Sequence, residues 1–410
     1  AHSMSIGIPG CLSPSPSSVV SARSIMPATE DLKKICSGYS NFLSSFQEDK
    51  KPFADFVWGQ PREPPLPGMV AALRQSVEAG SDPDADVAYF GYCAYTGKYL
   101  DIVARSVQKY RGVTVDAKDC FVTNGALAGL VVSLTVTTDP GDEVLMVDPT
   151  YYLYKPMCQM LGINGVPVPC KKENFDLDID AMEAAITPRS RAILINSPNN
   201  PTGRVYPAET LQKLGELLTR VNEGRDKPIM LISDEAYCRV VFDGVFAPSP
   251  IATYPYSVLV YTMGKQNLAP GERLGYMCLS PHMPEAAKVE MRDSVNRVIN
   301  AMWARPSTVS GRAMEQLDDV LVDIPTLQRR RDRVVQGLRE AGYSINVPQG
   351  TFYMMMECPR GLSGLDFVQE LAKHRVLVAA GEAMGLPGSV RLSLTCSDEM
   401  VEFALPVFAK

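Results

Sequence analysis

Two observations predict an α/β fold, in which a mostly parallel sheet is covered by helices on both faces and a smaller α+β domain follows it. Runs of continuously apolar or β-branched residues are typical of strands buried on both faces, and helix-length segments between them indicate parallel pairing. The sequence has six such runs: Cys120–Thr123, Glu143–Val147, Arg191–Asn196, Ile229–Ser233, Ser257–Thr262 and Leu274–Leu279. Beyond Pro306 the pattern changes to a long charged helical stretch, a turn at 348–350, short strands and a helix near Asp366–Lys373. This change predicts the second domain.

The segment that precedes the first of these runs has the periodicity of a helix. Leu100, Val103, Ala104, Val107 and Tyr110 recur at the spacing of one helix face, which predicts an amphipathic helix packed on the sheet. The organisation that we expect is a disordered tail with a tag remnant (1–29), an N-terminal arm that packs with the small domain (30–66), a large domain (67–306) and a small C-terminal domain (307–410).

Composition excludes several classes of function. The chain has 410 residues, of which 46% are hydrophobic and 21% charged, and its formal net charge is −6. Its longest basic block is Arg329–Arg331, whereas nucleic acid and anionic membranes require clustered positive charge. No apolar run reaches 18 residues, so we expect no transmembrane span. We therefore expect small-molecule substrates, and neither nucleic acid nor membrane as a partner.

Cysteine and histidine usage argues against a metal site. The ten cysteines form no Cys-x-x-Cys motif, and there are only three histidines. Free thiols suit a reducing compartment, so we expect a cytoplasmic protein. Residues 5–29 are rich in Ser and Pro and lack acidic residues, which is compatible with an organellar transit peptide as well as with a disordered tail.

The strongest chemical signal surrounds Lys265. This lysine lies between a buried apolar run and a Gly/Pro-rich loop, and Gly271, Arg273 and Gly275 follow it at six, eight and ten residues. A loop lysine is ordinarily a solvated surface residue. The fixed spacing of an arginine and two glycines is not typical of such a surface loop, and it favours a site.

Other polar motifs follow predicted strands. Asn200 lies in Ser197–Gly203, which alone would indicate a turn, and Asp234 and Tyr237 follow the next run, where the acid alone would indicate a helix cap. The segment Thr123–Leu127 leads from a strand into a helix, whose N-terminal amides suit a phosphate. Tyr151 follows Asp148-Pro149, and a core aromatic remains an alternative for it.

Together these motifs resemble the fold-type I pyridoxal phosphate enzymes, and specifically the class I/II aminotransferases of the aspartate aminotransferase superfamily. Seven motifs occur in the family's order over about residues 55–400. The resemblance implies pyridoxal 5'-phosphate as cofactor, a large cofactor-binding domain with a seven-stranded sheet, and a homodimer with shared active sites.

The resemblance also assigns roles to individual residues. Catalysis falls to Lys265, as the Schiff-base lysine and proton carrier, to Asp234 at the pyridine nitrogen, and to Tyr237 at the phenolic oxygen. The cofactor-binding set is Lys265, Gly125, Ala126, Leu127, Tyr151, Asn200, Asp234, Tyr237, Thr262, Arg273 and, reaching the neighbouring subunit, Tyr92. The substrate-binding set is Arg391, which clamps the α-carboxylate, Gly59 in the segment that closes over it, and Asn200.

Three departures from the family pattern are visible. Leu127 replaces a polar residue, so that only its amide can contribute to phosphate binding, and Gly264 stands where Ser or Thr often precedes the lysine. The segment 381–385 replaces a Pro-Gly-x-x-Phe-Gly pattern. These departures leave the subfamily open.

The resemblance implies transfer of an amino group between an L-amino acid and a 2-oxo acid by a ping-pong ketimine mechanism. Another pyridoxal phosphate reaction, namely elimination, cyclisation or oxidation, stays open because fold and cofactor do not determine the reaction. A ligand-binding regulator would need an appended DNA-binding module, for which the N-terminal arm has neither the length nor the charge. An inactive homologue is disfavoured by the retention of Lys265, Asp234, Asn200, Tyr237 and both arginines.

Overall fold

A computed structural model describes residues 29–48 and 50–410. The tail predicted over residues 1–29 lies, except for Thr29, outside the described residues. No helix of the described chain is long and apolar enough to cross a membrane.

The central feature is a seven-stranded sheet, as the resemblance implied, with the strand order β2-β8-β7-β6-β5-β3-β4. All neighbouring strands are parallel except β8, which is antiparallel to both β2 and β7. The strands are β2 (Cys120–Thr123), β3 (Glu143–Asp148), β4 (Asn164–Pro169), β5 (Ser190–Asn196), β6 (Met230–Asp234), β7 (Ser257–Thr262) and β8 (Gly275–Leu279). The α/β class predicted from the sequence is confirmed.

Strand β4 is the one strand of this sheet that no apolar run predicted. Its sequence, Asn164–Pro169, contains a glycine and two prolines, and it pairs only with β3. Proline lacks a backbone N–H and is therefore confined to edge strands, where no second neighbour requires that donor. The composition of β4 suits an edge strand. It lacks the continuous apolar run by which buried strands are predicted from sequence.

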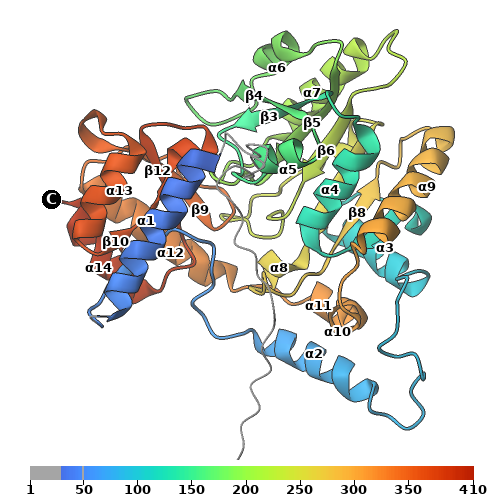
Figure 1. Ribbon diagram of the computed structural model, residues 1–410, viewed down its shortest axis with the longest axis horizontal. Coiled ribbons are helices and arrows are strands. Elements are labelled where there is room, and N and C mark those ends of the chain that lie inside the picture. The colour runs from blue at the N-terminus through green and yellow to red at the C-terminus, as the bar shows by residue number, and fades with distance from the viewer. Residues whose placement is uncertain (1–28, 49) are drawn as a thin grey trace, which may run out of the picture.

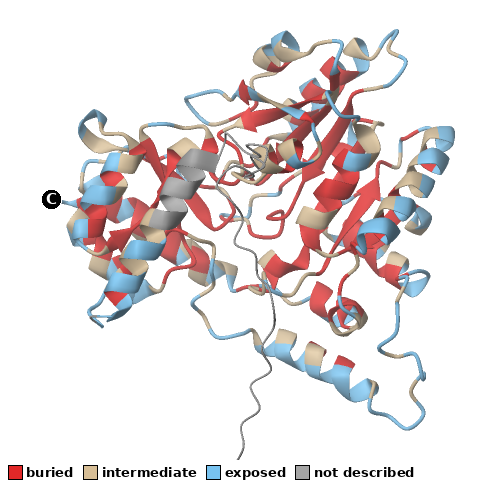
Figure 2. Cartoon of the chain, in the orientation of Figure 1, coloured by how far each residue is buried: buried red, intermediate tan, exposed pale blue. Residues whose placement is uncertain are grey.

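Helices cover both faces of the sheet (Figure 1). Helices α4 (Gly125–Thr137), α5 (Tyr154–Met160) and α9 (Glu285–Met302) share a hydrophobic core with one face. Helix α3 (Lys98–Arg111), together with α6 (Ile179–Ala185) and α7 (Ala208–Val221), packs on the other. Figure 2 shows that the strands and the helix sides facing them are buried. Helix α11 (Met314–Asp318) lies beside α3, and α2 (Pro67–Ala79) packs against α11 and α10 (Thr308–Arg312).

A second unit follows at the C-terminal end. Its antiparallel sheet has the order β11-β12-β9, from β9 (Tyr353–Glu357), β11 (Ala379–Ala380) and β12 (Ser389–Ser393). Helices α12 (Ile324–Glu340), α13 (Gly364–Lys373) and α14 (Asp398–Phe408) pack with it. The helical stretch predicted after Pro306 is divided into α10, α11 and α12, because Asp323 caps a new helix whose second residue is Pro325.

The N-terminal residues pack on this second unit. Helix α1 (Thr29–Glu48) lies along it in Figure 1, and β1 (Ala54–Asp55) pairs in parallel with β10 (Val376–Leu377). The guanidinium of Arg375 donates hydrogen bonds to the Pro52 and Lys51 carbonyls. The chain therefore reaches the large sheet only after it has been tied to the C-terminal unit. The boundaries at 66/67 and 306/307 remain predictions.

A buried ion pair fixes the end of β6 from behind. The Arg111 Nε donates to Glu235 at 2.9 Å, and both side chains are almost wholly buried. Hydroxyls of Ser233 and Ser249 donate to the same carboxylate. A buried charge is tolerated only when it is paired and hydrogen-bonded, so this carboxylate depends on its arginine.

We predict that Arg111→Ala lowers the free energy of unfolding by about 3–5 kcal/mol, since it leaves the Glu235 carboxylate buried without its cation. Denaturant unfolding followed by circular dichroism measures this loss. Arg105→Ala is the matched control, because its partner Glu315 and Arg105 itself are both well exposed, and it should change stability by less than about 1 kcal/mol. Equal losses in the two variants would contradict the prediction.

Candidate active site

Strand alternation gathers polar side chains at one edge of the large sheet. In β5, Ala192 and Leu194 face the α4 side, as do Met230 and Ile232 in β6 and Val258 and Val260 in β7. Because side chains alternate along a strand, Asn196, Asp234 and Thr262 at the ends of these strands face the same side. The carboxyl ends of parallel strands form one edge, which is where open α/β sheets bind ligands.

A cavity of about 280 Å³ lies at this edge. The predicted site residues that line it are Gly59, Ala126, Leu127, Tyr151, Asn200, Asp234, Tyr237, Thr262, Lys265, Arg273 and Arg391. Gly125 is buried directly behind the Arg273 guanidinium. The structure therefore brings together residues that are more than 300 positions apart in the sequence.

Lys265 enters the cavity from a short helix. The chain leaves β7 at Thr262, whose hydroxyl accepts from the Gly264 amide and so begins α8 (Met263–Gln266). The Lys265 Nζ lies 5.4 Å from the ring centroid of Tyr237, whereas Gln266 and Asn267 donate to the carbonyls of the α11 region. Lys265 is thus directed into the cavity while its neighbours anchor the turn.

Asp234 is the buried acid of the site. It is 5% exposed, and its carboxylate accepts from the Tyr154 hydroxyl at 2.6 Å and from the Ala236 amide at 3.1 Å. Burial raises the pKa of Asp234, whereas the Tyr154 hydroxyl, the Ala236 amide and the positive charge of Lys265 act in the opposite direction. A carboxylate held in this way can face a cationic ring nitrogen.

The N-terminus of α4 and Arg273 form a cradle for an anion. Gly125, the first residue of α4, has φ +77°, and a Cβ there would lie 2.8 Å from an Arg273 terminal nitrogen. A Cβ on Gly275 would in turn overlap the Tyr261 carbonyl and lie 2.9 Å from the Gly125 Cα. The free amides of a helix N-terminus and a guanidinium suit a phosphate group.

Arg391 is the largest fully buried side chain, at 1% exposure. It donates to the Asn200 side-chain oxygen at 3.1 Å and to the Val57 carbonyl at 2.7 Å. Its Nε has no hydrogen-bond partner within the described part of the chain, although it is buried. A buried, incompletely bonded guanidinium at a cavity wall is suited to a two-point contact with a carboxylate.

Aromatic rings line the remaining walls. Burial raises the pKa of Tyr151 well above its usual value, so its hydroxyl stays protonated. Tyr151 contacts Tyr152 and Tyr154 edge-on, and Tyr152 lies 5.9 Å from Trp58, centroid to centroid. These aromatic side chains can cover one face of a planar ligand.

Tyr92 does not line this cavity. Its side chain is 92% exposed, and its ring packs edge-on against Trp303 with centroids 4.8 Å apart. The assignment made from the resemblance places Tyr92 in the site of a neighbouring subunit, which a single chain does not test, and it stays a prediction.

Sequence reasoning missed several wall residues: Trp58, Gln60, Leu130, Tyr152, Asn196, Ala236, Pro270 and Tyr353. It also missed Tyr154, which bonds Asp234 from outside the wall. Asn196 could have been found as the strand residue opposite Asp234, and its side-chain amide donates to the Asp234 carbonyl. Tyr353 carries no local signal, because its place depends on the pairing of β9 with β12.

Comparison with known proteins finds aminotransferases among both the family profiles and the individual relatives. The sequence profile of the family described as aminotransferase class I and II matches residues 59–408. A probable aspartate/prephenate aminotransferase of Thermus aquaticus is 30% identical over 316 residues, covering 76% of this chain and 80% of its own. An arginine–pyruvate transaminase of Pseudomonas aeruginosa is also 30% identical, covering 82% and 83%.

Solved structures agree with these sequence relatives. An amino transferase from Eubacterium rectale superposes with a TM-score of 0.84 at 28% identity, covering 92% of this chain and 94% of that chain. The aspartate aminotransferase from Rhizobium meliloti gives a TM-score of 0.81 at 26% identity, covering 97% and 98%.

We predict that Gly125→Ala weakens binding of pyridoxal 5'-phosphate by about tenfold or more, because the new Cβ displaces Arg273 and a charged hydrogen bond is worth roughly 1.5–3 kcal/mol. Spectrophotometric titration of the apoprotein measures the dissociation constant. Gly141→Ala is the control: Gly141 also has a positive φ (+93°) but faces open space. A Gly125→Ala protein that binds like the control would show that this cradle holds no phosphate.

Proposed function

The chain belongs to the class I and II aminotransferases, and from this premise we propose that it moves an amino group between an L-amino acid and a 2-oxo acid with pyridoxal 5'-phosphate as its resident cofactor. The observation that carries the proposal is the Arg391 guanidinium, which is buried in the wall of the cavity that Lys265 also lines and whose Nε has no hydrogen-bond partner among the described residues. That arrangement provides one binding group for an amino acid's carboxylate and one amine close to it.

The residues present fit the cofactor. Its phosphate matches the cradle of the α4 amides, Thr262 and Arg273, and its ring matches the wall formed by Tyr151. The ring nitrogen would face Asp234, and the ring oxygen would face Asn200 and Tyr237. When it is bound, the cofactor supplies a carbonyl that takes up the amino group and a ring that accepts electrons from the substrate α-carbon.

The chain's own groups then have defined tasks. Arg391 binds the α-carboxylate in two-point contact and so sets the direction in which the α-hydrogen points. The Lys265 Nζ, once it is free, removes the proton from the α-carbon as a general base. The Asp234 carboxylate would stabilise positive charge on the cofactor's ring nitrogen. Because the cavity has a low dielectric constant, this electrostatic interaction lowers the barrier to removal of the proton from the α-carbon. The ketimine ping-pong sequence remains part of the proposal.

We also propose a homodimer in which Tyr92 completes the partner's phosphate site. Support comes from the exposed apolar side chains of the same region. Val87 is fully exposed, and Phe90, Tyr92 and Trp303 are 57%, 92% and 46% exposed. Exposed apolar clusters of this kind mark interaction surfaces. Placement in the cytoplasm stays a prediction from the composition alone.

We predict that mixing the holoenzyme with an amino acid and no 2-oxo acid converts the bound cofactor to pyridoxamine phosphate, which absorbance and cofactor analysis detect. Lys265→Ala should abolish this conversion, because the proton acceptor at the α-carbon is lost. Release of ammonia, a cyclised product or peroxide with the cofactor unchanged would instead indicate elimination, cyclisation or oxidation. Wild-type-like conversion by Lys265→Ala would refute the lysine assignment.

A second prediction concerns the amino donor. The cations among the described residues that line the cavity are Lys265, Arg273 and Arg391, and each already has a task. These walls therefore leave no cation for a second carboxylate, and the aromatic wall suits an apolar side chain. We expect kcat/KM for neutral or aromatic donors to exceed that for aspartate by about tenfold or more, as one unpaired buried charge would cost several kcal/mol. A preference for aspartate would place the second cation on the partner subunit.

A further inference from the structure

Tyr353 lies in the cavity wall without a role in the assignments above. It is the first residue of β9, and β9 pairs with β12 so that Ser393 lies opposite Tyr353 and Arg391 lies opposite Met355. Residues two positions apart face the same side of a strand, and diagonal neighbours across an antiparallel pair are within reach of long side chains. The Tyr353 ring accordingly packs on the Arg391 guanidinium, with 4.0 Å between the centroid and Cζ.

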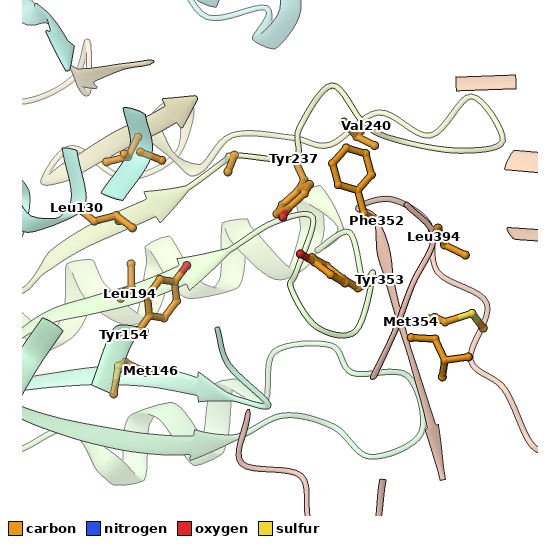
Figure 3. Packing of buried hydrophobic residues seen from close by; sticks show 14 of the residues in the cluster. Leu130, Met146, Tyr154, Leu194, Tyr237, Val240, Phe352, Tyr353, Met354 and Leu394 are labelled. Carbon is orange, nitrogen blue, oxygen red and sulfur yellow. The ribbon is translucent and has the colours of Figure 1, made fainter. Parts of the chain in front are cut away.

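The hydroxyl end of Tyr353 contacts two other parts of the site. It lies against the Gly59 backbone, and the Tyr353 ring packs edge-on with the Tyr237 ring, with centroids 6.1 Å apart. Figure 3 shows the Tyr237 and Tyr353 hydroxyl oxygens facing each other. A Cβ on Gly59 would overlap the Tyr353 hydroxyl, so only glycine lets the chain approach this closely.

Charge around this hydroxyl favours its role as an acceptor. Burial by itself raises the pKa of Tyr353, but the positive charges of Arg391 and Lys265, followed by the polar groups of Tyr237 and Gly59 beside the hydroxyl, hold the pKa below its usual value. Burial, followed by the neighbouring Tyr353 and Tyr151, raises the pKa of Tyr237 well above its usual value. Tyr237 therefore keeps its proton.

The segment that contains Gly59 is tied to β12 at several points. The Ser393 amide donates to the Phe56 carbonyl at 2.9 Å, Arg391 donates to the Val57 carbonyl at 2.7 Å, and the Thr395 hydroxyl donates to the Trp58 carbonyl at 3.2 Å. Segment 56–59 thus meets the edge of the Arg391 guanidinium, whereas the Tyr353 ring covers one face of it.

We propose that Tyr353 is a positioning residue that couples the carboxylate clamp to segment 56–59, through its ring on Arg391 and its hydroxyl on Gly59 and Tyr237. The ring shields one face of the guanidinium from water, so a carboxylate approaches its edge, where the buried Nε has no hydrogen-bond partner among the described residues. The hydroxyl keeps segment 56–59 in the position that closes this edge. The proposal rests on the proposed function in that Arg391 is taken to bind the substrate carboxylate.

The test uses Tyr353→Phe, which keeps the ring and removes the acceptor, with Tyr343→Phe as the control. Tyr343 packs in the C-terminal unit against Phe367 and Phe408 and does not line the cavity. Calorimetric titration of the holoenzyme with propionate, a carboxylate without an amino group, measures clamp affinity. We expect about fivefold weaker propionate binding in Tyr353→Phe, as for the loss of one polar contact, a donor KM that rises more than kcat falls, and no change in Tyr343→Phe.

A second measurement separates positioning from packing. In a pH titration of the apoprotein by phenolate absorbance, an ionisation below the usual tyrosine range should be absent from Tyr353→Phe and present in Tyr343→Phe. A Tyr353→Phe protein with wild-type propionate affinity and a wild-type titration curve would overturn this proposal alone. Wild-type holoenzyme that fails to bind propionate, or Arg391→Ala that binds it equally well, would contradict the proposed function and this proposal together.

Discussion

A buried guanidinium without an acidic partner is the interaction on which the site depends. Arg391 is 1% exposed, and no carboxylate of the described residues forms an ion pair with it; its contacts are an amide oxygen, a carbonyl and an aromatic face. A desolvated charge of this kind is costly in the free protein and gains most when an anion arrives. Three chain segments, which contain Val57, Asn200 and Tyr353, meet at Arg391 and hold it in place.

Asp234 and Glu235 are adjacent buried carboxylates, and each compensates for the cost of burying a charge in a different way. Adjacent residues of a strand point to opposite faces, so Asp234 enters the cavity and Glu235 enters the core behind it. Glu235 is neutralised by Arg111 and contributes to stability, whereas Asp234 receives only hydrogen bonds and the more distant charge of Lys265. One strand end thus combines a structural carboxylate with a chemical one.

The fold divides the binding tasks between its two units. The large sheet contributes Asp234, Thr262 and the α4 terminus to the cavity wall, while β12 and β9 of the C-terminal unit contribute Arg391 and Tyr353. Segment 56–59 reaches both. A substrate that touches Arg391 therefore draws on groups from both units, and the hydrogen bond between Arg391 and Asn200 already joins them.

The sequence by itself determined the α/β class, the lysine with its arginine and glycine spacing, and the residues at four strand ends, since these are local features: apolar runs, turn residues and fixed intervals. Only the tertiary structure decided which distant side chains meet. Tyr353 reaches Arg391 through the register of β9 on β12, and Tyr154 reaches Asp234 across the sheet face, so neither has a signal in its own neighbourhood. Edge strand β4 was likewise hidden, because its prolines are read from sequence as breaks, and only the pairing with β3 places them in a strand at the edge of the sheet.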